Sequence, residues 1–402
     1  MNEFNRLERK LIALTDRVSL KMALFSAALM TMLGPILIAP ALPAIAKHFE
    51  STPHIEVLTG LSMTIPALFV LLLAPVAGTL MDKYGRLKFI YPAMVVWILS
   101  GLAGGLSESI YALIISRCAL GIATAFITTG ASALLGDYYM LGAGRREKAL
   151  GMQGFVMALG GACMTMIAGL VVGLGWRWVF GIYGMGIVIF ILCVWKLFEP
   201  RAHRYLSQST HTSSAKVSWR DFLPFVPLYF VGFFMSFVYY LVPVEFPHYI
   251  ADVLGLSSRL SGVALAVPII SYGLFCFLYS KVVKKIGARN IYLVALGIEA
   301  LSFGALYLWQ DVAVSFCALF VFGMAGGLIM TNNSALLFAK APAFMRARAY
   351  SVLASSMFIG QLISPLITTP LRNALGYETL FLVLTVLIAL VCAWSARGFR
   401  GV

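Results

Sequence analysis

Long runs of apolar residues without any charge alternate with short polar segments along this chain. The runs from Leu61 to Leu80 and from Phe89 to Ser107 contain no Asp, Glu, Lys or Arg. A helix needs about 20 apolar residues to cross the hydrocarbon core of a bilayer. Barrel strands would instead alternate apolar and polar residues at every second position. The pattern therefore predicts an all-α membrane protein whose helices span the bilayer.

Twelve such runs account for most of the chain. A polar stretch from Glu199 to Asp221 separates six of them from the other six, and its composition is typical of a linker. We therefore expect an N-terminal six-helix bundle at 1–198, a cytoplasmic linker at 199–221 and a C-terminal six-helix bundle at 222–402. The expected spans are 22–46, 57–80, 89–107, 110–136, 149–173, 176–198, 222–247, 258–280, 290–309, 313–338, 349–371 and 376–396.

The two sets of spans repeat each other weakly, at an offset of about 200 residues. Gly175 and Trp176 recur as Gly376 and Tyr377. The glycine that follows the second span, Gly85, has its counterpart after the eighth span. Parallel repeats in transporters are related by an axis along the membrane normal, and the substrate site lies near the midplane between them. The repeat therefore favours two pseudo-symmetric halves around a common centre.

Composition and charge agree with a lipid environment. The chain is 61% hydrophobic and 11% charged, whereas about 25% of a soluble domain is charged. The net charge of +14 does not indicate nucleic-acid binding. About 25 of the Lys and Arg residues lie on the same side of the membrane as the N-terminus, and about four lie on the other side. This asymmetry predicts that both termini lie in the cytoplasm. We expect the protein in the bacterial cytoplasmic (inner) membrane. The six cysteines lie inside spans without ligand spacing, so we expect no disulfide, metal or cofactor.

A charged turn lies between the second and third spans. It reads Gly78-Thr-Leu-Met-Asp82-Lys-Tyr-Gly85-Arg86, and its two glycines permit a sharp return of the chain. This segment resembles the signature loop, G-x-L-x-D-R-x-G-R, of the major facilitator superfamily. The resemblance implies two six-helix bundles that alternate access to a central site. It also implies a cytoplasmic gate in which Gly78, Asp82, Gly85 and Arg86 act with Asp137, the acid that ends the fourth span.

Arg117 lies inside the fourth span, four residues before Gly121. The pair resembles the R-x-x-x-G motif of the drug:proton antiporters with 12 spans. A buried guanidinium is costly in lipid and should face a cavity or a partner. The resemblance implies roles for Arg117 in substrate binding and in proton coupling. Snorkelling of its long side chain to the membrane surface is the alternative.

Two acids lie within or beside the C-terminal spans, and we assign both to proton coupling. Glu245 stands between Pro243 and Pro247, which we expect to break the helix and expose the acid to the cavity. The alternative is a carboxylate at the aqueous surface, paired with Arg259 or with His248. Glu299 lies at the centre of the ninth span. It either carries protons or is a neutral acid hydrogen-bonded to a neighbouring helix.

Uncharged polar side chains complete the expected substrate site. Helices 7 and 10 line the cavity in this family, which places several polar residues beside it. An amide at this depth either binds substrate or links two helices. The expected substrate-binding residues, besides Arg117, are Tyr239, Tyr240, Glu245, Asn332, Asn333 and Gln361.

These residues predict a secondary active transporter and no enzyme. The chain has no phosphate-binding loop for ATP. The expected cargo is a small amphipathic organic solute, a drug or a metabolite, exported as a monomer in exchange for protons, without nucleic acid. The fifth span lacks the glycine–proline pair of the family's antiporters and has Cys163-Met164 there. The alternatives are therefore an exporter of one secreted metabolite, such as a siderophore, or a facilitator that is not coupled to protons.

Overall fold

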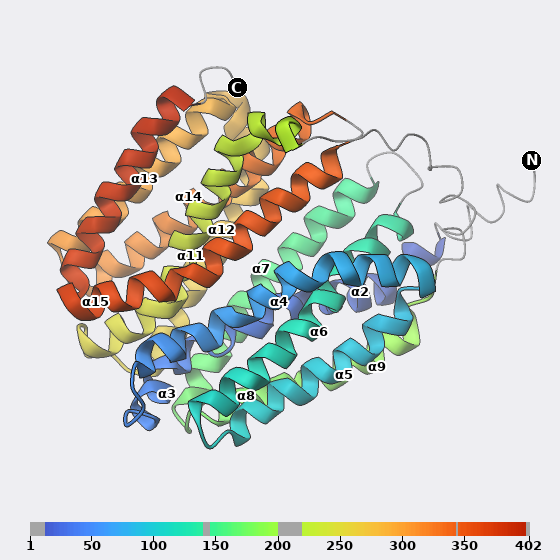
Figure 1. The fold of residues 1–402 in the computed structure, drawn as a ribbon, viewed down its shortest axis with the longest axis horizontal. Helices are drawn as coiled ribbons and strands as arrows, with labels where there is room; N and C mark the ends of the chain where they lie inside the picture. The colour runs from blue at the N-terminus through green and yellow to red at the C-terminus, as the bar shows by residue number, and fades with distance from the viewer. Residues whose placement is uncertain (1–12, 140–144, 200–218, 343–344, 399–402) are drawn as a thin grey trace, which may run out of the picture.

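The computed structural model describes residues 13–139, 145–199, 219–342 and 345–398, and within these ranges the chain is a bundle of long helices (Figure 1). Eleven segments of the described residues are long and apolar enough to cross a membrane. The fold class predicted from the sequence is therefore confirmed. The long helices are α2 (Val18–Ile36), α4 (Ile55–Tyr84), α5 (Leu87–Ala103), α6 (Ile110–Tyr138), α7 (Arg145–Val172), α9 (Met185–Lys196), α11 (Val226–Asp252), α12 (Ser258–Ile286), α13 (Ala288–Leu308), α14 (Val312–Lys340) and α15 (Arg346–Gly398).

Short helical turns extend or connect the long helices. After α2 the chain continues through η1 (Ala39–Ala41) into α3 (Leu42–His48), so the first span runs from Val18 to His48. The sixth span is likewise built from several pieces, because two short turns precede α9. The remaining short elements are η2 (Gly104–Leu106), α8 (Trp178–Gly181), η3 (Ile182–Gly184) and η4 (Trp219–Phe225).

The structure has eleven continuous segments where the sequence predicted twelve, because α15 contains both of the last two spans. Its 53 residues would make a straight rod of about 80 Å, much longer than a bilayer is thick. The backbone leaves the helical conformation at Gly376, with φ 78° and ψ 170°. Figure 1 shows the two arms of α15 meeting at this bend. The two predicted spans are therefore present, but no loop separates them.

The helices before residue 199 pack mainly against one another, and so do those after residue 219. Most contacts between these halves are those of α4 with α15 and of α7 with α12. Smaller contacts are made by α3 with α11, and by η1 with α11 and α12. In Figure 1 the blue and green helices of the first half lie beside the yellow and red helices of the second. The boundaries expected for the two bundles stay a prediction, since residues 200–218 lie outside the described part of the chain.

Corresponding glycines of the two halves share an unusual backbone conformation. Gly85 and Gly287, which follow α4 and α12, have φ values of 100° and 79°. Gly175 and Gly376 have φ values of 131° and 78°. A residue with a Cβ atom is strained in this region, whereas glycine is not. The repeat found in the sequence therefore corresponds to matching turns in the two halves.

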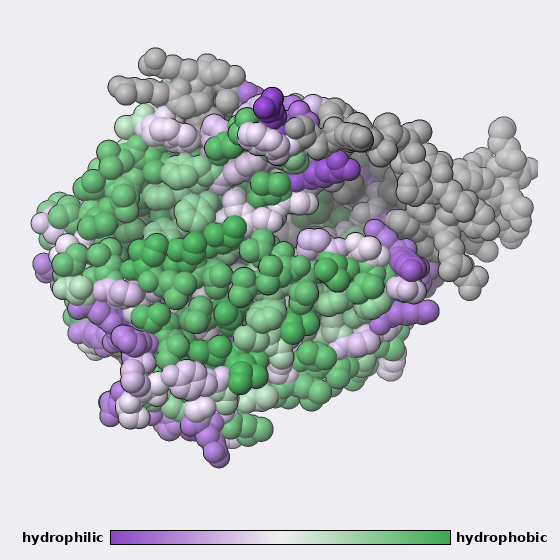
Figure 2. Space-filling model, viewed as in Figure 1, coloured by the Kyte–Doolittle hydropathy of each residue, from purple (hydrophilic) through white to green (hydrophobic). Residues whose placement is uncertain are grey.

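Apolar side chains cover much of the outer surface between two polar ends. On the face shown in Figure 2, hydrophobic residues form a broad band and hydrophilic residues gather at its ends. Val188 and Leu301, for example, are 70% and 73% exposed. Such a surface is expected where the surrounding solvent is lipid.

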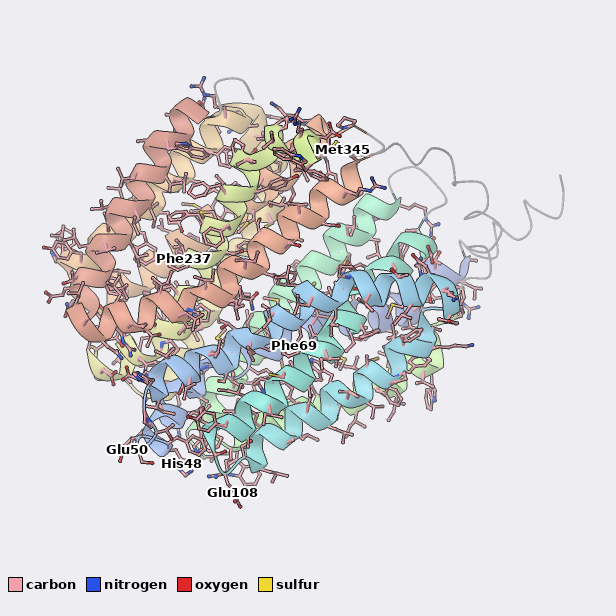
Figure 3. The ribbon with its side chains drawn as sticks, viewed as in Figure 1. His48, Glu50, Phe69, Glu108, Phe237 and Met345 are labelled. Carbon is pink, nitrogen blue, oxygen red and sulfur yellow. The ribbon has the colours of Figure 1, made fainter. Side chains whose placement is uncertain are left out.

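We call the end with the α4–α5 and α12–α13 turns the basic end. The opposite end holds His48, Glu50 and Glu108 (Figure 3).

Candidate functional site

A central cavity of about 480 Å³ lies between the two halves. Helices α2 and α7 contribute to it from the first half, and α11, α12, α14 and α15 from the second. None of its lining residues is charged. Its walls combine aromatic rings with flexible thioethers, namely those of Phe155, Tyr239, Tyr240, Tyr272, Phe277, Met32, Met157, Met235, Met330 and Met357.

Three tyrosines form the polar part of this apolar wall. The ring of Tyr239 lies 5.9 Å from that of Tyr240 and 5.7 Å from that of Tyr272, in both cases edge to face. It also stacks on Phe322 at 5.6 Å. Ser236 adds a hydroxyl one helical turn before Tyr240. Aromatic faces with a few hydroxyls can hold an apolar molecule and orient it by hydrogen bonds.

The two halves touch closely at the opposite end and separate toward the basic end. A methyl group built on Gly262 would lie 2.7 Å from Cα of Gly169, so the backbones of α12 and α7 are in contact there. A methyl group on Gly60 of α4 would lie 2.8 Å from Cβ of Pro365 of α15. Near the start of α7, by contrast, a methyl group on Gly154 would meet no described atom within 4 Å. The cavity therefore lies on the basic side of these contacts.

Tyr239 and Tyr240 are the two predicted binding residues that line the central cavity. Arg117, Glu245, Asn332, Asn333 and Gln361 are not among its lining residues. Substrate binding by these five stays a prediction, and the structure places each of them in another environment.

The guanidinium of Arg117 is fully buried inside the first half. It donates to the carbonyl oxygens of Ser100 and Gly101 at 2.9 and 3.2 Å, and to the hydroxyl of Tyr183 at 3.0 Å. That hydroxyl in turn donates to the carbonyl of Gly34 at 2.5 Å. The side chain therefore does not snorkel. Its hydrogen bonds offset the cost of burial and join α2, α5, α6 and η3.

Glu245 lies in a helix that the two prolines do not break. Helix α11 continues through both of them from Val226 to Asp252, so the predicted break is wrong. Neighbouring helices compensate for the backbone hydrogen bonds that a proline cannot make within a membrane. The carboxylate is buried, and its Oε1 accepts hydrogen bonds from Thr368 at 3.1 Å and Thr369 at 2.6 Å.

The partner of Glu245 is Arg372, and not Arg259 or His248. Nη1 of Arg372 lies 2.9 Å from Oε2 of Glu245, an ion pair whose angles fall short of a hydrogen bond. Nη2 of the same arginine lies 2.5 Å from Glu56 of α4. Arg372 also donates to the hydroxyl of Tyr377 at 3.2 Å. We call Glu56, Glu245 and Arg372 the Arg372 cluster, which joins the two halves at the opposite end.

Sequence reasoning did not single out Arg372 and Glu56, which form an ion pair between the two halves. One modest indication was available: Arg372 is one of about four Lys and Arg residues on the side of the membrane away from the N-terminus. Its neighbours Thr368 and Thr369 supply hydroxyls at the spacing of one helical turn, which suits a buried acid on another helix.

The signature turn forms a compact cluster within the first half. Buried Arg86 makes an ion pair with Asp137, and a longer one of 3.9 Å with exposed Asp82. Glu199 accepts hydrogen bonds from the backbone nitrogens of Arg86 and Leu87, both at 2.9 Å. This carboxylate stabilises the start of α5, where backbone donors are free and the helix dipole is positive.

One of the two motif glycines shapes that turn, namely Gly85, which has the positive φ described above. Gly78 lies inside α4, and a methyl group added there would make an ordinary contact of 3.7 Å with Thr129 of α6, so the sharp return of the chain does not depend on it. The gate function of the five predicted residues stays a prediction. Glu199, which the sequence placed at the start of the linker, is the partner that was missed.

Glu299 is fully buried on α13, and neither carboxylate oxygen has a hydrogen-bond partner among the described residues. The hydrogen bond to a neighbouring helix that the sequence offered as an alternative is therefore not present there. Helix α13 packs against α14 and α15 within the second half. Proton coupling by Glu299 stays a prediction.

The two asparagines of α14 link helices of the second half. Asn332 accepts from the hydroxyl of Tyr279 and donates to the carbonyl of Ala288, both at 2.9 Å. Asn333 accepts from Tyr292 at 2.9 Å and donates to Leu228 at 2.8 Å. Both amides are thus occupied, as expected for helix-linking residues. Gln361 is buried on α15. Among the described residues no group of His, Cys, Asp and Glu could hold a metal ion.

A bundle of two similar helical halves around a central cavity defines a polytopic membrane transporter. The sequence profile of the Major Facilitator Superfamily matches residues 24–365. The chain belongs to this superfamily, and the resemblance noted in its signature turn is confirmed.

Relatives of known name agree with this placement. The chain is 24% identical over 308 residues to the uncharacterized MFS-type transporter YwfA of Bacillus subtilis, covering 75% of this chain and 73% of YwfA. It is 23% identical to the multi-drug resistance efflux pump PmrA of Streptococcus pneumoniae, covering 90% of this chain and 92% of PmrA.

The fold is also similar to solved structures. A bacterial homologue of the human lysosomal transporter Spinster, in an inward-facing and occupied conformation, matches with a TM-score of 0.78 at 19% identity over 94% of this chain and 96% of that one. A point mutant of the nucleoside transporter NupG matches with a TM-score of 0.78 at 10% identity, over 96% of this chain and all of NupG, 100%. The family and the fold are those of transporters.

Proposed function

We propose that this protein is a secondary active transporter that exports a small amphipathic organic solute by alternating access, in exchange for protons. The central cavity carries this proposal, because it lies between the two halves and draws its walls from both. Its volume of about 480 Å³ is within the range of drug-sized binding sites. Relatives such as PmrA, which is named as a multi-drug resistance efflux pump, support export.

The chemistry of the cavity favours a substrate without a localised charge. Tyrosine and phenylalanine faces attract flat apolar groups and delocalised cations, and methionine side chains adapt to varied shapes. An anionic metabolite such as a siderophore would need a fixed cation. Arg117, the cation that the sequence assigned to the cavity, is not among its lining residues and donates to groups inside the first half instead. This argues against the siderophore alternative.

Orientation supports loading from the cytoplasm. The turns of the basic end carry Lys83, Arg86, Lys284, Lys285 and Arg289, and basic loops remain on the cytoplasmic side during insertion. The halves are separated at this end and joined at the other. The described arrangement is therefore suited to receive a solute from inside the cell.

Proton coupling fits Glu245 best among the candidates. Its carboxylate and that of Glu56 share one guanidinium, and Glu56 belongs to the other half. A proton on Glu245 would remove one of the two negative charges that hold Arg372, and so alter the contact that closes the opposite end. Arg117 and Glu299 have no comparable connection between the halves.

Proteoliposomes with an imposed pH gradient test this function. The probe is a bisbenzimide dye that fluoresces in the bilayer and not in water. We expect the protein to remove dye only with a gradient of the correct direction, and Glu245→Gln to abolish that dependence. Glu378→Gln, which changes an exposed acid bonded to Gln310, is the matched control. Equal transport with and without a gradient indicates a facilitator, and absence of transport with any amphipathic probe contradicts the proposal.

A further inference from the structure

We propose that the turn between α12 and α13 binds the headgroup of an anionic phospholipid in the cytoplasmic leaflet. Four exposed bases of this turn, which we call the basic turn, are Lys281, Lys284, Lys285 and Arg289. The inference names a partner of the second half. It uses the proposed orientation of the basic end, but it does not depend on what the protein transports.

The corresponding turn of the first half contains its own counter-charges. Arg86 pairs there with Asp137 and, at 3.9 Å, with Asp82. The carboxylate of Glu199 accepts hydrogen bonds from the backbone nitrogens of Arg86 and Leu87, both at 2.9 Å. The start of α5 therefore already holds an anionic group, supplied by the protein itself.

The second half has bases where the first half has these acids. Lys284 precedes Gly287 by three residues, as Asp82 precedes Gly85. Helix α14 corresponds to α6, and it ends at the basic end with Lys340, where α6 ends with an acid at its penultimate position. The repeat has thus kept the shape of the turn, with a positive φ at both glycines, and has changed the sign of its charge.

The basic turn has no counter-charge among the described residues. Of the acids after residue 219, Asp221 alone lies at the basic end, and no ion pair joins the three lysines to a described acid. The lysines are spaced by three and four residues on α12, so their charges repel one another on one helical face.

The start of α13 adds a second reason for an anion. Arg289 lies in the first turn of this helix, where the helix dipole disfavours a positive charge. Gly287 has no side chain that could accept from the first backbone nitrogens of α13, whereas Glu199 accepts from those of α5. An external phosphate would supply the negative charge that the first half provides from its own chain.

An exposed apolar strip continues from the basic turn along α13. Val294 and Leu301 are 47% and 73% exposed, and a methyl group on Gly297 between them would meet no described atom within 4 Å. From Asn290 to Leu301 the helix rises about 16 Å, which is about half of the hydrocarbon core. A cationic site followed by an apolar strip of this length matches one phospholipid better than it matches a soluble polyanion.

The second arm of α15 places the basic turn at the membrane surface. Arg289 donates to the carbonyl of Ala396 at 2.9 Å, and the thiol of Cys392 donates to the carbonyl of Leu293 at 3.4 Å. Trp394 lies between these two contacts and is 40% exposed. Tryptophan is enriched at the level of the lipid headgroups, so the adjacent basic turn lies where the phosphates of this leaflet lie.

Binding of a labelled lipid to the full-length protein in detergent micelles tests the inference. The probe is phosphatidylglycerol with a fluorescent group on one acyl chain, and its anisotropy measures binding. The variant Lys281→Gln/Lys284→Gln/Lys285→Gln should bind it about tenfold more weakly. The control Lys83→Gln/Lys88→Gln/Lys148→Gln removes the same charge from exposed lysines at the basic end of the first half, and it should leave the affinity unchanged.

Two further comparisons separate charge from other causes. The variant Lys281→Arg/Lys284→Arg/Lys285→Arg retains the charge and should retain binding, so a loss in this variant as well would overturn the inference. Labelled phosphatidylcholine, whose phosphate is neutralised by choline, should bind the unchanged protein and all variants equally weakly. Equal losses of phosphatidylglycerol in the glutamine variant and its first-half control would also overturn the inference, because the charge of the whole basic end would then attract the lipid.

Competition identifies the source of the anion. Unlabelled phosphatidylglycerol should displace the probe, whereas glycerophosphoglycerol, the same headgroup without acyl chains, and inorganic phosphate should not displace it at the same concentration. Displacement by either soluble anion would assign the basic turn to a soluble ligand and would overturn the lipid site.

Discussion

The two interfaces between the halves close the protein in different ways. At the α4–α15 interface an ion pair between Glu56 and Arg372 joins the halves, next to the contact of Gly60 with Pro365. At the α7–α12 interface the backbones of the two helices touch at Gly262 and Gly169, because neither residue has a side chain. The first contact depends on charge and can change when a proton binds. The second depends on volume, so it can act as a fixed point about which the halves move.

The largest expected effect is that of removing Arg372. In Arg372→Ala the buried carboxylate of Glu245 loses its counter-charge, and breaking a buried pair in this way costs about 3–5 kcal/mol. Unfolding of the purified protein in micelles measures the loss. The double variant Arg372→Ala/Glu245→Gln should recover much of it. Arg289→Ala, an exposed arginine bonded to the carbonyl of Ala396, should change the free energy of unfolding by less than about 0.5 kcal/mol. Similar losses at both arginines would remove the special role of the cluster.

The next largest effect concerns close packing of the backbones at the α7–α12 interface. Gly262→Ala places a methyl group 2.7 Å from Cα of Gly169 and 2.8 Å from the carbonyl oxygen of Thr165. Backbone atoms cannot move aside easily, so we expect a loss of about 1–3 kcal/mol in the free energy of unfolding. Gly154→Ala is the same substitution on the same interface where the helices diverge, and it should be neutral or slightly stabilising. A comparable loss at both positions would mean that α7 and α12 also meet near the basic end.

A smaller effect is expected for Glu56→Gln. This carboxylate is partly exposed, and a pair of this kind contributes up to about 1 kcal/mol. The substitution should weaken closure of the opposite end without affecting the fold. Reaction of a cysteine placed at Asn373 with a membrane-impermeant maleimide measures that closure, and the rate should rise relative to the protein with Glu56. An unchanged rate would indicate that close packing at Gly60 is sufficient to keep this end closed.

The smallest expected effect on stability concerns ion pairs within the first half. Asp16, which precedes α2, contacts Lys21 at 3.1 Å and Arg145 at 3.0 Å. The hydrogen bond with Lys21, followed by the charge and hydrogen bond of Arg145, lowers the pKa of Asp16. Because this pKa is lowered, the ion pairs stabilise the folded protein fully at pH values above the pKa of Asp16 in the unfolded state. This stabilisation is lost as the pH falls through the pKa of Asp16 in the folded state. Asp16→Asn should therefore flatten the acid side of the stability profile slightly, without altering transport at neutral pH. A pH-independent loss would contradict this account.

The sequence predicted the spans well because lipid imposes a local rule, namely that each crossing helix must be apolar and long enough. It also identified the paired turn glycines and two tyrosines of the cavity wall. Partner choice was less accessible. Glu56 and Arg372 are 316 positions apart, and no local pattern shows which of several bases an acid meets. Arg117 lies inside a span as predicted, yet carbonyl groups and a tyrosine from its own half surround it. The expected break of α11 at Pro243 did not form, because packing of α11 against its neighbours outweighs the backbone hydrogen bond lost at each proline.

The hydrogen bonds that Glu199 accepts from the start of α5 have a practical consequence for dividing the molecule into its halves. Glu199, the last described residue before 200–218, binds the signature turn, so a fragment ending after Glu199 keeps every described contact of that turn. A fragment ending a few residues earlier would lose the carboxylate that holds Arg86 in place. Anyone who wishes to produce the halves as separate polypeptides, and to ask whether they reassemble, should therefore divide the gene beyond this codon.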